Sequence, residues 1–234
     1  MSCTWRVEAP GQTVFVKLVS SASRPPVTPG RWEAQLKHSL RPSVALRTHR
    51  VSQRMVERGL LVPEVLLAAS RRHGWRRDDL LATRAVTGFS LVEALTDGSC
   101  RDVVHETFRM VGRRIADLHR AGFVHGHLLP GHVFITPDRT DVCFLDNDET
   151  RRRPGGMREA DRRNNLTQLV SRMRAGHLPG TSGAVRCLLE AYFDAIGVSG
   201  RHRRRWHYRL LTRVRKRSQK RSRRRVHRVA ATGA

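Results

Sequence analysis

The chain has 234 residues, of which 39% are hydrophobic, and this is enough for one sizeable core or for two small lobes that share a cleft. No run approaches the roughly 18 apolar residues of a membrane helix, and residues 1–12 lack the pattern of a secretory signal, so we expect a cytoplasmic protein. The four cysteines are far apart and form no CxxC pair, which argues against a zinc site and a disulfide framework. The net charge of +25 is uneven, because residues 201–228 contribute +15 with no acidic residue and leave about +10 for the rest.

The first 90 residues have the pattern of an antiparallel sheet with one helix. Residues 13–19 are β-branched and apolar, which predicts a strand, and Lys17 inside it has either a functional role or an exposed position. Residues 46–58 repeat apolar side chains near helical spacing and are followed by Gly59, which suits a left-handed helix cap. The other expected elements are a loop over residues 20–30, strands over 60–69 and 80–86, and a polar turn over 71–79 between these strands.

The second half of the chain predicts a mostly helical region. The clearest helix spans residues 102–120, where apolar side chains recur at steps of four and three before Gly122. Apolar segments at 133–135 and 142–145 are joined by a polar turn, which predicts a hairpin. Two more helices are expected at 165–174 and 184–196, with a boundary at 197–200.

One stretch, residues 118–148, resembles the catalytic core of lipopolysaccharide kinases of the Kdo kinase and WaaP type, and more distantly that of protein kinases. Its sequence is LHRAGFVHGHLLPGHVFITPDRTDVCFLDND. His125-Gly126 matches the His-Gly pair of that family, Pro130-Gly131 matches the Pro-Gly before a metal-binding Asn, and residues 145–148 match the Ile-Asp-Phe-Asp run. The resemblance extends over residues 5–195 and implies an α+β, two-lobed protein-kinase-like fold.

In such a fold the N-lobe, a small antiparallel sheet with a helix, would cover residues 1–95, and the mostly helical C-lobe would cover residues 96–200. Residues 201–234 would form an Arg-rich tail. The resemblance also implies roles for single residues. Lys17 would contact the nucleotide phosphates, Asp146 would bind Mg²⁺ with Asp148 as a second ligand or a local cap, and His125 would hold the loop as a scaffold.

Two catalytic positions of the family pattern are replaced in this chain. His127 stands where the family has the Asp that accepts the substrate proton, and His132 stands where it has an Asn that binds a second metal ion. A neutral imidazole can accept a proton near pH 7, but it lacks the negative charge that orients Mg²⁺. The alternative is that His127 and His132 are structural. Residues 47–50 of the first helix contain no acid, and only residues 9–11 stand in for a glycine-rich loop.

These features leave three functions open. An active protein would use ATP and Mg²⁺ to phosphorylate a sugar of a lipid A core or another lipopolysaccharide precursor. An inactive pseudokinase would keep the fold, with or without nucleotide affinity, as a binding or scaffold module. In the third interpretation, the Arg-rich tail binds nucleic acid through its charge.

The tail also has an apolar stripe, because Trp206, Leu210 and Val214 follow one another at steps of four. This pattern is expected of a basic helix that lies on an anionic lipid surface, which would make the protein peripheral at the inner membrane. The alternatives are a disordered, solvated tail and binding of nucleic acid by charge alone.

Overall fold

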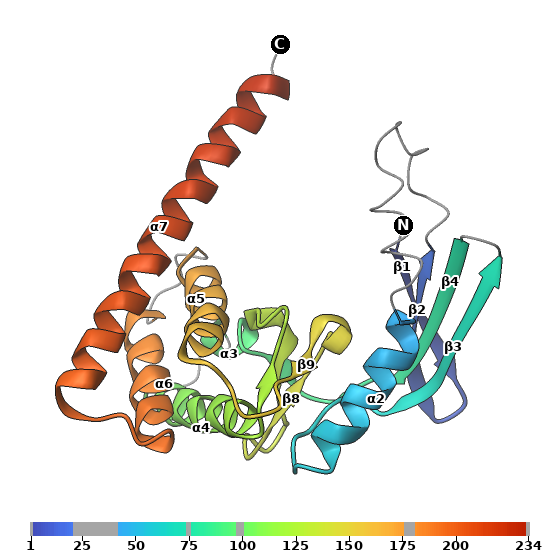
Figure 1. Ribbon diagram of the computed structural model, residues 1–234, viewed down its shortest axis with the longest axis horizontal. Helices are drawn as coiled ribbons and strands as arrows, with labels where there is room; N and C mark the ends of the chain where they lie inside the picture. Colours follow the sequence, from blue (N-terminus) through green and yellow to red (C-terminus); the bar gives the residue numbers. More distant parts are fainter. Residues whose placement is uncertain (1, 21–41, 74–75, 97–100, 176–180, 233–234) are drawn as a thin grey trace. The chain divides into compact units, whose positions relative to one another are not determined.

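The computed structural model describes residues 2–20, 42–73, 76–96, 101–175 and 181–232 (Figure 1). The chain divides into two compact units, one formed by Met1–Thr87 with Phe144–Thr150 and the other by Gly88–Cys143 with Arg151–Ala234. The first unit is built on an antiparallel sheet and the second is mostly helical. The expected α+β fold class, with a small antiparallel sheet and a helical part, is therefore confirmed.

The sheet of the first unit has four antiparallel strands. The strands are β1 (Ser2–Ala9), β2 (Gln12–Ser20), β3 (Val65–His73) and β4 (Arg76–Arg84), in the order β1-β2-β4-β3. A two-residue turn at Pro10 and Gly11 joins β1 to β2, and Gly11 takes a φ of 74°, which favours glycine. The strand expected around Lys17 is confirmed as β2, which pairs with strands on both sides. Most of the loop expected at 20–30 lies outside the described residues.

The two adjacent strands expected on either side of residues 71–79 are confirmed as β3 and β4, but the bounds of the turn were too wide, because the β3–β4 ladder continues to His73 and Arg76. Ser70 pairs with Asp79 and Arg71 with Asp78 in the antiparallel register. Asp79 is polar and yet buried, because it accepts hydrogen bonds from the Ser43 hydroxyl at 2.6 Å and from the Val44 N–H at 2.8 Å. A polar residue here therefore supports a neighbouring helix instead of marking a turn.

That helix, α2 (Val44–Val56), confirms the helix expected at 46–58. Ser43 caps its start, where the Ser43 hydroxyl accepts the Leu46 N–H at 3.2 Å. Met55 is fully buried, and Gly59 ends the helix region with a φ of 70°. Leu60, expected to open a strand, instead closes the helix end through its N–H to the Met55 carbonyl, so the strand starts later at Val65.

The second unit packs its helices around the predicted periodic one, which is confirmed as α4 (Arg101–Arg120). Its apolar stripe is buried, with Phe108, Val111, Ile115 and Leu118 at 0% exposure. A side chain at Gly112 would overlap the Leu188 carbonyl, so α4 closely approaches the helix α6 (Thr181–Ala195) there. The other helices are α3 (Glu93–Thr96), α5 (Glu159–Ala175), α6 (Thr181–Ala195) and α7 (Gly200–Thr232).

Short strands accompany these helices. The expected hairpin is confirmed as β7 (Val133–Ile135) and β8 (Val142–Phe144), which form a sheet in the order β5-β7-β8 with β5 (Phe89–Ser90). A two-stranded sheet joins β6 (Phe123–Val124) to β9 (Arg151–Arg152). We did not expect β5, β6 or β9, because two residues are too few for a periodic pattern.

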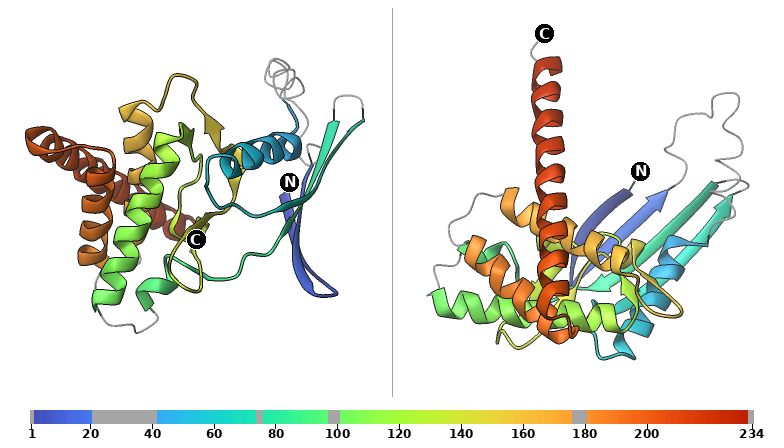
Figure 2. Two further views of the ribbon diagram at one scale, coloured as in Figure 1. Left: turned by 90° about the horizontal axis from the view of Figure 1, so that it is seen from below. Right: turned by 60° about the vertical axis from the view of Figure 1, so that its left-hand side comes forward.

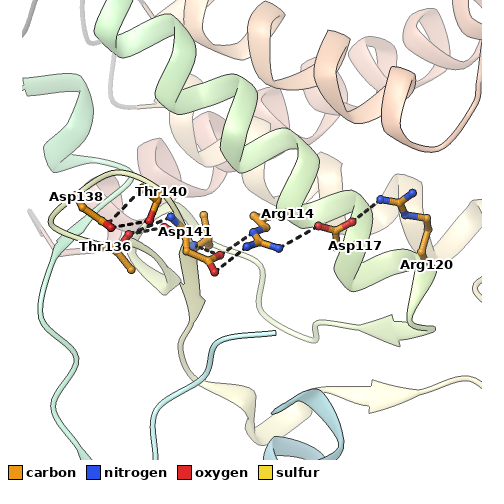
Figure 3. A network of polar contacts seen from close by, with 8 residues as sticks. Arg114, Asp117, Arg120, Thr136, Asp138, Thr140 and Asp141 are labelled. Atoms are coloured by element: carbon orange, nitrogen blue, oxygen red, sulfur yellow. Dashed lines mark hydrogen bonds and ion pairs between the residues drawn. The ribbon is translucent and has the colours of Figure 1, made fainter. Parts of the chain in front are cut away.

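The turn of the β7–β8 hairpin is held to α4 by a polar network (Figure 3). Asp138 accepts the Thr140 hydroxyl at 2.7 Å, and the Asp141 N–H donates to the Thr136 hydroxyl at 3.0 Å. Arg114 of α4 contacts the Asp141 carboxylate at 2.7 Å and 2.8 Å. The hairpin is thus fixed at its turn as well as by its ladder.

The basic C-terminal segment forms the long helix α7, which packs against α5 in the second unit (Figures 1 and 2). Trp206, Leu210 and Val214 are 2%, 0% and 2% exposed. The Trp206 ring packs edge-to-face on Phe193 of α6 with the centroids 5.1 Å apart. The expectation that this stripe faces an anionic lipid surface is therefore wrong, because the stripe belongs to the core. No helix in the described ranges has the length and apolar character that crossing a membrane requires.

Candidate functional site

A cluster of opposite charges lies within the first unit, where β2 meets the turn at residues 146–148. The Lys17 ammonium donates to Asp146 Oδ1 at 3.0 Å and to Asp148 Oδ2 through a shorter contact. The side chains of Lys17, Asp146 and Asp148 are 27%, 30% and 17% exposed. The structure therefore brings together the predicted nucleotide lysine and the two predicted metal carboxylates, and it leaves them partly open to solvent.

The lysine stays charged in this setting. Burial lowers the pKa of Lys17, but hydrogen bonding to Asp148 and the charges of Asp148 and Asp146 outweigh this effect, so the pKa is raised above its ordinary value. The Lys17 ammonium lies between the Asp146 and Asp148 carboxylates, and its positive charge offsets the repulsion between them. Any cation that replaces Lys17 there would meet the same pair of carboxylates.

The backbone at residues 144–150 aims the two carboxylates. Asp146 adopts the left-handed conformation with φ 57° and ψ 57°, which costs about 1 kcal/mol for a residue with a side chain. Asn147 is buried and locks the turn, since its Nδ2 donates to the Phe144 carbonyl at 2.8 Å and its Oδ1 accepts the Thr150 hydroxyl at 3.2 Å. Where the family pattern has Phe, this chain thus uses an amide to hold the turn.

Helix α2 supports Asp148 from the other side. Arg47 donates to the Asp148 backbone carbonyl through a short contact, and the Thr48 hydroxyl lies 3.4 Å from Asp148 Oδ1. In protein kinases the helix at this place carries a Glu that pairs with the strand lysine. Here Asp148 pairs with Lys17 instead, and α2 supplies a cation that holds the Asp148 segment.

The two carboxylates suit Mg²⁺ better than an all-protein metal cage. Mg²⁺ prefers oxygen ligands and is usually held by one or two carboxylates together with substrate phosphates. Asp146 and Asp148 supply such a pair, because both reach the same ammonium. Within the described ranges, no group of three or more His, Cys, Asp or Glu side chains could hold a metal ion by itself. The imidazole of His132 is a poor match for Mg²⁺ by its donor type.

The three histidines predicted for the site lie in one loop of the second unit. His125 is fully buried, and its ring Nδ1 accepts the backbone N–H of His127 at 3.2 Å. His132 follows Pro130 in a short 3₁₀ helix, and its Nδ1–H donates to the His127 carbonyl at 2.9 Å. The rings of His125 and His132 therefore brace the backbone on both sides of His127, whose own side chain is exposed.

Asn165 of α5 clamps this loop to the helices. Its Oδ1 accepts the His125 N–H at 3.1 Å, and its Nδ2 donates to the His125 carbonyl at 2.6 Å. The same Oδ1 accepts Nε2–H of His119 at 3.2 Å, so Nδ1 of His119 accepts the Tyr192 hydroxyl at 2.8 Å. Burial, in the first place, lowers the pKa of His119 to about 3, and nearby Arg162 and His125 add to this effect. The network is therefore uncharged at neutral pH.

Sequence reasoning missed three residues that shape these two places. Arg47 was noted only as the absence of an acid, Asn147 only as part of a motif, and Asn165 only as the start of a helix. A buried Asn in an otherwise apolar face is a usable signal for Asn165, because such an amide needs partners. Arg47 and Asn147 carry no comparable signal in the sequence.

The sequence of this chain matches one known protein family. The model of the lipopolysaccharide kinase (Kdo/WaaP) family matches residues 32–192, which confirms the resemblance indicated by the motif at 118–148. Lys17 precedes the matched segment, so its assignment rests on its contacts with Asp146 and Asp148. A search of curated proteins finds no significant match.

Among solved structures, the bifunctional kinase-methyltransferase WbdD is similar to this chain, with 13% sequence identity and a TM-score of 0.48. The similar region covers 86% of this chain but 45% of WbdD. The chain thus spans less than half the length of that protein.

Proposed function

Because the chain belongs to the lipopolysaccharide kinase (Kdo/WaaP) family, we propose that it binds ATP with Mg²⁺ at Lys17, Asp146 and Asp148 and phosphorylates a sugar hydroxyl of a lipid A core at a low rate. The observation that carries this proposal is the Lys17 ammonium between two partly exposed carboxylates. A lysine and an Asp near the phosphates are the parts that kinases use to bind a nucleotide.

Each charged residue has a distinct task in this proposal. Asp146 and Asp148 would hold Mg²⁺, which neutralises charge on the phosphate oxygens when it is bound. Lys17 would exchange part of its carboxylate contacts for contacts with phosphate oxygens. This exchange costs little, because all three side chains are already partly hydrated and the number of opposite charges around the lysine is kept.

His127 would accept the proton of the sugar hydroxyl. Its exposed side chain and its braced backbone support this role. A neutral imidazole can accept a proton near pH 7, but it brings no negative charge to a metal site. The low rate in the proposal follows from this loss of charge and from His132 at the position of the second metal ligand.

Nucleotide binding is the first step to test. We expect ATP to bind the full chain more tightly with Mg²⁺ than without it, and both Lys17→Met and Asp146→Asn to weaken binding by about tenfold or more, since each removes a charged contact worth about 1.5 to 3 kcal/mol. Isothermal titration calorimetry gives these affinities. The matched control is Arg84→Gln, which removes a cation paired with Glu64 on the surface of the same unit. Equal weakening by the control would contradict the proposed site.

Phosphotransfer is the second step. We expect the double variant His127→Asp with His132→Asn to raise the rate of phosphate transfer from ATP to a Kdo-containing lipid A acceptor, because it restores the anionic proton acceptor and the oxygen metal ligand. A radiolabelled ATP assay measures the product. If both proteins bind nucleotide and neither transfers phosphate, the chain is a pseudokinase and this part of the proposal fails.

A further inference from the structure

Helix α7 presents a basic face that the proposed phosphotransfer does not use. Arg201, Arg205, Tyr208 and Arg215 follow one another at steps of four, three and seven, so they lie on one side of the helix. All four are exposed, and Tyr208 is 73% exposed. The adjacent Arg204 is exposed as well. We call these five residues the arginine face.

The opposite side of α7 is fixed to the second unit. Besides the buried stripe of Trp206, Leu210 and Val214, Arg203 pairs with Asp194 at 2.6 Å and lies over the Phe193 ring at 5.6 Å. These contacts hold the first half of the helix in place. The arginine face is therefore a rigid surface and not one side of a loose tail.

The charge of this surface is one-sided. Asp194 is the last acidic residue of the chain, and residues 201–228 add fifteen Lys or Arg. No arginine of the face forms an ion pair with a residue that the structure describes. The arginine face spans residues 201–215 of the helix, a length of about 21 Å, so its positive charge forms a linear track rather than a pocket (Figure 1). Such a track matches an extended chain of phosphates.

Two observations favour nucleic acid over a lipid surface. A basic helix that inserts into lipid needs an exposed apolar stripe, and the stripe of α7 is buried in the protein. Tyr208 instead stands alone as an exposed aromatic ring among arginines, which is the arrangement that stacks on an unpaired base while cations contact the backbone. In a regular duplex the bases are paired and stacked on one another, so their faces are not open to stacking by such a ring.

We propose that the arginine face of α7 binds single-stranded nucleic acid, with the arginines on the phosphates and Tyr208 stacked on a base. The site is independent of nucleotide binding at Lys17. Its chemistry requires phosphodiester charge and an unstacked base, and it implies no strong preference for sequence.

A charge-matched pair of variants tests the backbone contacts. The probe is a fluorescein-labelled oligouridylate of about 16 nucleotides, whose binding to the full chain is followed by anisotropy over a range of salt concentrations. The face variant carries Arg→Gln at 201, 204, 205 and 215, and the control carries Arg→Gln at the exposed positions 50, 54, 58 and 186. We expect the face variant to bind about tenfold more weakly or worse, with a smaller salt slope by roughly 0.7 for each lost phosphate contact, and the control to bind like the parent.

Tyr208 tests the stacking contact. Tyr208→Ala should weaken binding about fivefold or more, and Tyr208→Phe should restore it, because the phenylalanine ring stacks equally well. Circular dichroism of each variant checks that α7 remains folded. Equal weakening by the control variant, or equal binding of a duplex of the same length, overturns the proposal. So does tighter binding to vesicles of equal parts phosphatidylcholine and phosphatidylglycerol than to the oligonucleotide.

Discussion

The two units treat polar groups in opposite ways. In the strand-rich unit, Lys17, Asp146 and Asp148 form ion pairs and remain partly exposed. In the helical unit, His119 and Asn165 are buried and uncharged, His119 bonds the Asn165 side chain, and Asn165 bonds the loop backbone at His125. Ion pairs that are partly hydrated can exchange one partner for a ligand at a small cost in free energy. A buried neutral network is not accessible to ligands, and its hydrogen bonds fix the position of the backbone that they contact. The first arrangement suits binding and the second suits support.

The largest effect is expected where the neutral network meets the aromatic core. Trp206 lies against Tyr192, whose hydroxyl donates to His119. Trp206→Ala should lower the free energy of unfolding by about 3 to 5 kcal/mol, because it leaves a large cavity. Tyr208→Ala, two residues away and exposed, should change it by less than about 0.5 kcal/mol. Urea unfolding followed by circular dichroism compares the two, and similar losses would mean that α7 is not docked as described.

Acid should weaken the helical unit through His119. In the unfolded chain this imidazole takes up a proton near its ordinary pKa of 6.5, but in the folded protein it does so only near 3. Stability is therefore full above pH 6.5 and falls as the pH is lowered towards 3, by about 3 kcal/mol at pH 4. His119→Gln should unfold with a flatter pH dependence over this range. If the free energy of unfolding of the variant fell with pH as steeply as that of the parent, His119 would not be the cause of the acid sensitivity.

Loss of the loop clamp should have a somewhat smaller effect. Asn165→Ala removes both hydrogen bonds to the His125 backbone and leaves buried groups without partners, so we expect a loss of about 2 to 3 kcal/mol. Asn164→Ala is the neighbouring control, since Asn164 is exposed and accepts only a surface contact from Arg213. Thermal unfolding measures both variants. The clamp would be unimportant if the two melted alike.

The charged cluster should matter least for stability. Lys17→Met should cost about 1 kcal/mol or less at neutral pH, because partly exposed ion pairs contribute little. The raised pKa of Lys17 means that its contribution is complete below its ordinary value of 10.5 and is lost as the pH rises through its folded value. Stability measured at alkaline pH should therefore converge for the parent and the variant. A large loss at pH 7 would show that the cluster is structural.

Much of the fold could be predicted because its signals are local. The helix at 102–120 and the strand around Lys17 rest on side-chain periodicity, which survives any tertiary context. The bounds of the turn expected at 71–79 were too wide, because Asp79 lies in β4 and is buried against a helix whose start is 35 residues earlier in the chain, which no local pattern reveals. The prediction that the stripe at Trp206 faces a lipid surface was wrong for a different reason. An apolar helix face has the same sequence pattern whether a membrane or α6 covers it.

In the candidate site, the charged residues could be predicted from the sequence and the residues that support them could not. Lys17, Asp146 and Asp148 could be named from motif order, and the structure brings these three together. The supporting residues could not be named, because Arg47 and Asn165 act through backbone atoms that are distant in sequence. Motifs identify groups that do chemistry, whereas the groups that position them are set by packing.

Labelling of Lys17 by a lysine-reactive acyl phosphate of ATP tests the central claim most directly. The reagent transfers its acyl group to a lysine amine beside the bound phosphates, and mass spectrometry of the digested full chain locates it. We predict Mg²⁺-dependent labelling of Lys17 that excess ATP prevents, while Lys216 on α7 reacts without protection. Labelling of Lys17 that ATP does not reduce, or protection of Lys216 alone, would contradict a nucleotide site between Lys17, Asp146 and Asp148.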